Sequence, residues 1–197
     1  LRDGKQVFTD QHPLAVFPPM RLAAMACEVG LFDPKGGTRE LFQSQGLTTV
    51  AVSSLARLPQ NIDLLVVGAG AFAAAPDEPP VIGRISPERK AIVEFVARGG
   101  RVLVLEQVVY PEGLFDVEST GHASTMTFPA ASDHPALRGV LPEDLKFWRG
   151  DHYVTQAEPP RPVAGSSAAI IVSGSRAGID HAPLLEQSIG RGAIVYC

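Results

Sequence analysis

One stretch of the sequence constrains the fold more than any other, because a helix, a glycine stop and a strand follow one another without a gap. Ser86 can cap a helix, and Pro87 suits the first helical position. Gly99-Gly100 ends that helix, and the apolar run Val102-Leu-Val-Leu105 follows at once. A strand without polar alternation is covered on both faces, so this stretch predicts a parallel sheet between helices.

The same alternation of strands and helices recurs along the chain. It predicts an α/β protein whose sheet is mainly parallel, with a closing hairpin that adds an antiparallel edge. We expect strands at 22–27, 48–52, 62–67 and 168–172, a helix at 38–45, and a hairpin formed by 184–189 and 193–196. Residues 107–128 lack periodicity and predict a long loop or an insertion with short strands of its own.

Composition excludes several classes of protein. Seventeen Lys and Arg residues against 21 Asp and Glu residues give a net charge of −4, and a nucleic-acid-binding surface needs the opposite sign. No apolar run approaches the roughly 20 residues of a membrane span. We therefore expect neither nucleic acid nor a membrane as a partner. Cys27 and Cys197 form no metal-binding pattern, and we expect two buried thiols.

The first residues differ from the rest. Residues 1–19 contain two short extended runs and end at Pro18-Pro19, which blocks a continuing strand. We interpret 1–19 as the tail of a preceding β-sandwich domain plus a linker, with an arm packed on the main domain as the alternative. Residues 20–197 form the α/β domain, and we interpret the whole as a piece of a longer polypeptide.

Ligands in parallel sheets bind beyond the carboxyl ends of the strands, which makes Glu28, Gly68, Gly70, Glu106 and Gln107 binding candidates. The string from Gly68 matches the dinucleotide pattern G-x-G-x-x-A, but nearby prolines would break the helix that such a site requires. A tight turn is the favoured interpretation. Glu106 suits a structural role, or acid–base chemistry if its pKa is raised.

Three Asp-His pairs occur, at 133–134, 151–152 and 180–181. Adjacent residues of a strand point to opposite faces, so we expect turn and cap chemistry here, with no metal site and no cofactor. His152 remains a binding candidate. Trp148 is interpreted either as a core anchor or as a platform on which a sugar ring stacks.

The chain from about Leu22 to Cys197 resembles the class I glutamine amidotransferase-like superfamily. The resemblance is carried by Asp63–Gly70, Ile92–Leu105, His134–Gly139 and the closing 182–195 segment. It implies a flavodoxin-like three-layer sandwich. Active members carry a cysteine in a Gly-x-Cys-x-Gly elbow and a downstream His-x-Glu. This chain has Glu106 at the first position and no His-x-Glu string, so the resemblance implies a degenerate site with no catalytic residue.

Among such proteins the chain is most similar to non-catalytic domains of β-galactosidase-type glycoside hydrolases. The resemblance therefore implies an accessory domain that assists assembly or shapes a substrate cleft. Its partners would be other domains of the same polypeptide, a second copy of the chain, or a carbohydrate, and its parent an exported bacterial enzyme. A carbohydrate-binding module and a cryptic hydrolase that uses Glu106 are the alternatives.

Overall fold

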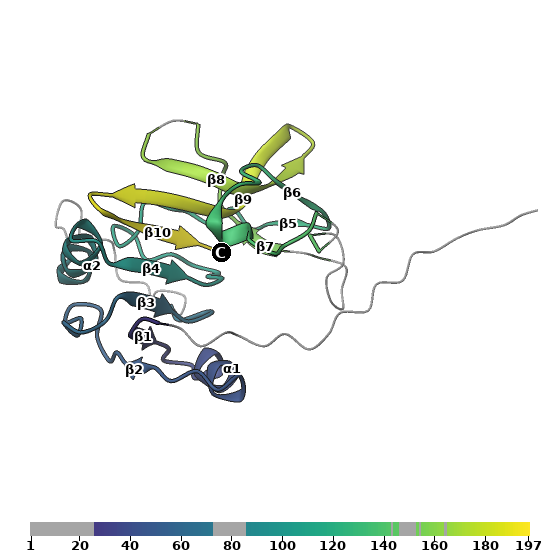
Figure 1. Ribbon diagram of the computed structural model, residues 1–197. Helices are drawn as coiled ribbons and strands as arrows, with labels where there is room; N and C mark the ends of the chain where they lie inside the picture. Colours follow the sequence, from purple (N-terminus) through teal and green to yellow (C-terminus); the bar gives the residue numbers. More distant parts are fainter. Residues whose placement is uncertain (1–25, 73–85, 143, 146–152, 154, 164) are drawn as a thin grey trace, which may run out of the picture.

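Eight strands pair into one mixed sheet in the order β2-β1-β3-β4-β10-β9-β8-β6, and β5 pairs with β7 in a small second sheet (Figure 1). The computed structural model describes residues 26–72, 86–142, 144–145, 153, 155–163 and 165–197. The elements are β1 (Val29–Phe32), α1 (Gly37–Ser44), β2 (Val50–Ala51), β3 (Leu64–Val67), α2 (Pro87–Ala97), β4 (Arg101–Val104), β5 (His122–Ser124), β6 (Thr127–Pro129), the 3₁₀ turn η1 (Pro135–Leu137), β7 (Thr155–Glu158), β8 (Ser167–Ser175), β9 (Gly178–Ile189) and β10 (Gly192–Tyr196). The predicted α/β class is confirmed.

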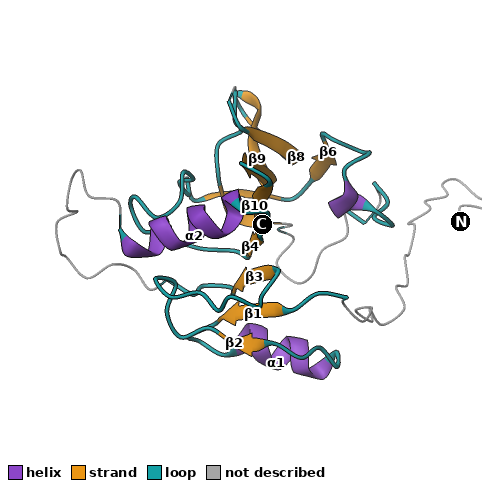
Figure 2. Cartoon of the chain, turned by 60° about the vertical axis from the view of Figure 1, so that its left-hand side comes forward, coloured by secondary structure: helices purple, strands orange, loops and turns teal. Residues whose placement is uncertain are grey.

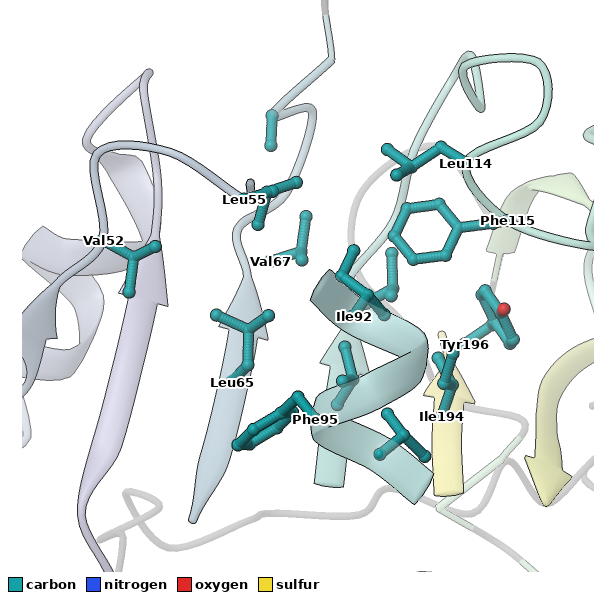
Figure 3. Packing of buried hydrophobic residues seen from close by; sticks show 14 of the residues in the cluster. Val52, Leu55, Leu65, Val67, Ile92, Phe95, Leu114, Phe115, Ile194 and Tyr196 are labelled. Atoms are coloured by element: carbon teal, nitrogen blue, oxygen red, sulfur yellow. The ribbon is translucent and has the colours of Figure 1, made fainter. Parts of the chain in front are cut away.

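The parallel half of the sheet is buried on both faces, as its apolar strands predict. β2, β1, β3, β4 and β10 run parallel to one another. Leu65 and Val67 pack into the cluster that contains Ile92 and Phe95 of α2 (Figure 3). Val66 of the same strand packs with Phe42 of α1 on the other face. Successive strand residues thus face opposite helices, which makes three layers.

Helix α2 lies along β4 and β10, whereas α1 lies beside β1 and β2 (Figure 2). The start of α2 is as the sequence predicts. The Oγ of Ser86 accepts a hydrogen bond from the backbone N–H of Arg89 at 3.1 Å, and Pro87 occupies the first helical position. The side chain of Ser86 therefore satisfies one of the amides that the first turn leaves unpaired. No helix among the described residues has both the length and the apolarity needed to cross a bilayer.

The first strand lies later than predicted. β1 is Val29–Phe32, and Ala26 and Cys27 lie outside it. Ile62 packs closely against β1, because a Cβ at Gly30 would lie 2.7 Å from its Cδ1. The bare backbone of Gly30 leaves room for this side chain, and Val29 and Leu31 beside it are buried.

The closing hairpin forms as predicted, but its position in the sheet differs from the prediction. β10 does not lie at an edge; it pairs in parallel with β4 and antiparallel with β9. β9, β8 and β6 then extend the sheet with antiparallel strands. The antiparallel part is thus a three-strand extension instead of an edge.

The hairpin turn approaches the end of α2 very closely. A Cβ at Gly192 would lie 2.1 Å from the carbonyl oxygen of Gly100 and 2.3 Å from that of Val96. Only a glycine allows two backbones to come this near. The helix, the strand that follows it and the hairpin are therefore locked together.

Candidate functional site at the carboxyl edge of the sheet

A pocket of about 170 Å³ lies beyond the carboxyl ends of β4 and β10. Glu106, Gln107 and Tyr110 follow β4, and Cys197 follows β10. The opposite wall comes from β7 and the residues around it. The lining residues are Glu106, Gln107, Tyr110, Thr155, Ala157, Glu158, Pro159, Pro183, Tyr196 and Cys197. Glu106 thus occupies the edge at which the sequence places the degenerate nucleophile.

The pocket contains a thiol, but its surroundings oppose nucleophilic chemistry. Although Cys197 is exposed as a whole residue, desolvation of its thiol, and then the charge of Glu106, raise the thiol pKa. A reactive cysteine needs the reverse, a pKa lowered by a nearby base or cation. None of the described residues that line this pocket is a histidine. The expectation of two buried thiols is wrong for Cys27, which is exposed, whereas the thiol of Cys197 is desolvated.

Tyr110 and Tyr196 give the pocket an aromatic wall. Their ring centroids are 6.2 Å apart at an interplanar angle of 70°, and both rings contact Phe115. Burial is the main cause of a raised pKa at both tyrosines; Cys197 and Glu106 add to it at Tyr110, and Asp116 does so at Tyr196. The Tyr196 hydroxyl donates to Oε1 of Gln187 at 3.0 Å. Both tyrosines therefore remain neutral, and Tyr196 is held by a hydrogen bond.

The loop after β3, residues 68–72, uses every backbone amide internally. Gly68 donates to the Phe32 carbonyl, Ala69 to Oγ1 of Thr38, and Ala71 to the Gly68 carbonyl. The N–H of Gly70 donates to the Glu106 carbonyl at 2.8 Å, and that of Phe72 to Oε1 of Gln107 at 3.3 Å. A phosphate cradle or an oxyanion hole needs free amides, so the geometry favours the tight-turn interpretation of Gly68 and Gly70.

Gln107 fastens this loop to the strand beside it. Its side chain is buried, and Nε2 donates to the carbonyls of Gly68 at 2.8 Å and Leu105 at 2.6 Å. All its polar atoms are thereby engaged within the protein. Gln107 thus shapes the pocket, which is lined by two carboxylates, Glu106 and Glu158.

Glu28 lies at the opposite edge of the sheet from Glu106. β1 begins at Val29, so Glu28 precedes the amino end of that strand, where its N–H donates to Oδ2 of Asp63 at 3.1 Å. The prediction that it shares an edge with Glu106 is wrong, because it assumed an earlier strand. Asp33 is the residue that follows β1; it is buried, and its Oδ2 accepts from the N–H of Arg39 at 2.8 Å.

The remaining candidates divide into two groups. Trp148 and His152, with the Asp151-His152 pair, lie outside the described residues. His134 caps η1, since its Nδ1 accepts the N–H of Ala136 at 3.2 Å, and its Nε2 lies 3.5 Å from Glu186. This is the cap chemistry that the sequence predicts for Asp133-His134.

The third Asp-His pair belongs to a cluster that the sequence did not reveal. His122 of β5, Glu158 of β7 and His181 of β9 each offer one ligand atom, and these atoms lie within 4.8 Å of one another. Nδ1 of His181 lies 2.9 Å from Oδ1 of Asp180. Strand register explains the assembly: His122 pairs with Glu158 across β5–β7, and His181 pairs with Ser173 across β8–β9. The three residues lie far apart in the chain, so no spacing motif could have shown them.

The sheet order and the helices on both of its faces define a mixed α/β protein with a mostly parallel sheet, consistent with a flavodoxin-like fold. The chain is similar to a ThuA-like protein from Bacteroides uniformis ATCC 8492, with 8% identity and a TM-score of 0.50 over 92% of this chain and 84% of that one. ThuA-like proteins have the glutamine amidotransferase-like fold, so this similarity supports the fold.

A second similar structure is the β-galactosidase from Rahnella sp. R3, with 13% identity and a TM-score of 0.45. The match covers 88% of this chain but 28% of the β-galactosidase, so the chain spans less than a third of that protein. No family model and no curated protein matches the sequence.

Proposed function

We propose that this chain is a non-catalytic accessory domain of a larger carbohydrate-active enzyme, in which it assists assembly or shapes a substrate cleft. One observation carries the first half of the proposal. At the edge where an amidotransferase needs a thiolate and an imidazole, this chain presents Glu106 beside a thiol whose pKa is raised, and no described histidine lines the pocket. Such a site lacks the base that would activate a nucleophile.

The carbohydrate half of the proposal rests on the sequence motifs that resemble β-galactosidase-type accessory domains. The structure is compatible with a cleft-shaping role. Tyr110, Pro159 and Pro183 give the pocket an apolar surface, and Glu106 lies beside it at the carboxyl edge of the sheet. Apolar faces beside a few polar groups are what sugar rings contact.

The first test asks whether the chain hydrolyses glutamine, the reaction that an active amidotransferase site catalyses. The purified 197-residue chain is incubated with glutamine, and ammonia release is followed. We expect no release above that of buffer. Release that disappears in Cys197→Ser would contradict the proposal, because it would show that Cys197 is an active nucleophile.

The second test uses the complete polypeptide encoded by the gene, once its coding DNA on both sides is sequenced. We expect a glycosidase domain in the same reading frame. Its kcat on nitrophenyl glycosides should be the same in Glu106→Gln and in the control Glu112→Gln, an exposed carboxylate on the same loop. Loss of kcat in Glu106→Gln with full activity in the control would favour the alternative of a hydrolase that uses Glu106.

A further inference from the structure

The carboxylate of Glu158 is fully enclosed in protein. Its side chain has 0% exposure, and its two oxygens accept hydrogen bonds from the hydroxyls of Thr155 and Ser173. Hydroxyl groups supply dipoles but no charge, and a buried carboxylate needs an opposite charge or a proton. The ion-pair partner of Glu158 among the described residues is His122, whose Nε2 lies 4.0 Å from Oε2.

Two imidazoles converge on this carboxylate. The rings of His122 and His181 are stacked, with centroids 3.9 Å apart at an angle of 19°. Neutral imidazoles are metal ligands, and one nitrogen atom of each ring lies together with a Glu158 oxygen within 4.8 Å.

The orientation of His181 is fixed by its neighbours. Oδ1 of Asp180 lies 2.9 Å from its Nδ1, and Oδ2 of Asp180 is held by the Ser175 hydroxyl at 2.7 Å. A carboxylate that accepts the Nδ1 proton leaves the lone pair on Nε2. The same carboxylate–histidine arrangement orients imidazole ligands in metal sites.

We infer that His122, Glu158 and His181 form a binding site for one divalent transition-metal cation, with Zn²⁺ as the best fit. Two imidazole nitrogens and one carboxylate oxygen form a ligand set that zinc takes in tetrahedral geometry with a fourth position open. Mg²⁺ and Ca²⁺ prefer all-oxygen sites and are disfavoured by the imidazoles. The site adjoins the pocket at the carboxyl edge of the sheet, because Glu158 also lines that pocket, and it ties the β5–β7 sheet to β9.

The test measures Zn²⁺ binding to the full chain by equilibrium dialysis and calorimetry. The background is Cys27→Ser with Cys197→Ser, because cysteine thiolates would bind zinc themselves. We expect one saturable equivalent per chain, and a melting temperature that rises with added Zn²⁺. Cobalt bound in its place should show the intense visible bands of tetrahedral coordination without a thiolate charge-transfer band.

Variants rank the residues by their role. His122→Ala and His181→Ala should each weaken binding by more than about 100-fold, whereas Asp180→Ala should weaken it about 10–100-fold, the usual effect of losing an outer-shell partner. His134→Ala is the matched control and should bind as the parent does, since His134 pairs with Glu186 instead. If Glu158→Gln fails to fold, the two histidine variants, which alter partly exposed side chains, still decide the question.

Two results would overturn the site. One is the absence of saturable binding in the double-serine background. The other is binding that persists unchanged in both His122→Ala and His181→Ala.

Discussion

At the scale of single residues, Gly192 is the position at which a side chain is least tolerable. The atoms that a Cβ would meet are carbonyl oxygens of Gly100 and Val96, and backbone atoms cannot rotate away as a side chain can. The contact joins β10 to the end of α2. A side chain at position 192 should therefore lower the stability of the whole domain.

Gly192→Ala should lower the free energy of unfolding by about 1–3 kcal/mol, the usual cost of forcing a methyl group into packed structure. Chemical denaturation measures it. Gly37→Ala is the matched control, because a Cβ at Gly37 has no heavy atom within 4 Å and Gly37 is the first residue of α1. The control should be neutral or more stable by up to about 1 kcal/mol. Equal effects in the two variants would show that the close approach is absent in solution.

Asp180 links stability to acid pH. Its pKa lies below the ordinary 3.8, first because the Ser175 hydroxyl donates to it and further because of His181. A carboxyl whose pKa is lowered by folding stabilises the protein above its ordinary pKa, and this contribution is lost as the pH falls through the folded value. Asp180→Asn should therefore melt earlier than the parent at neutral pH, with a difference that closes below about pH 3.8. In a Ser175→Ala background, the difference in melting temperature between Asp180→Asn and its parent should be smaller. A difference in melting temperature that does not change with pH would rule out this origin.

At the scale of elements, local signals fix some segments and not others. α2 was predictable because the sequence carries a start signal at Ser86-Pro87 and a stop signal at Gly99-Gly100, and the Ser86 cap is observed. β1 was misplaced because two short apolar runs, 22–27 and 29–32, follow one another, and the local pattern does not decide which of them forms the strand. β10 was assigned to a hairpin correctly, but no local pattern states which strand lies on its other side.

The cap of α2 gives a prediction at this scale. Ser86→Ala should cost about 1 kcal/mol of stability, since the Arg89 amide loses its acceptor. Ser86→Asp should keep most of it, because a carboxylate accepts the same bond and suits the positive end of the helix dipole. Thermal unfolding of the three proteins compares them. If Ser86→Ala and Ser86→Asp melt at the same temperature, the side chain has no capping role.

At the scale of the whole molecule, the aromatic wall of the pocket should determine how the stability of the folded chain changes at alkaline pH. Burial raises the pKa of Tyr110 and Tyr196 above the ordinary 10.0. A raised pKa means that the folded chain keeps protons that the unfolded chain releases. Stability from this source is complete below pH 10.0 and declines as the pH rises above it.

Tyrosinate absorbance measured during an alkaline titration should therefore rise late for these two residues, together with unfolding. Tyr196→Phe removes one of the two groups, so its loss of stability above pH 10.0 should be shallower than that of the parent. Both tyrosines ionising at their ordinary pKa in the folded protein would contradict the buried arrangement.

The site shows the same division between local and global information. The placement of Glu106 at the carboxyl edge was predictable, because a buried strand ends just before it. The cluster of His122, Glu158 and His181 was not, because it forms only when the register of β5–β7 and the position of β9 are set. The sequence identifies each of these residues as a possible ligand, but it does not show that they lie close together in the fold.

The strand order has a consequence for how copies of the chain can associate. In the described part of the molecule the outermost strands of the large sheet are β2, with two residues, and β6, with three residues that end on Pro129. Short outer strands and a proline without an N–H offer little template for a further strand. The sheet is thus protected against edge-to-edge growth and fibril-like aggregation, and any assembly of copies should use side-chain surfaces such as the exposed Phe128 and Met126.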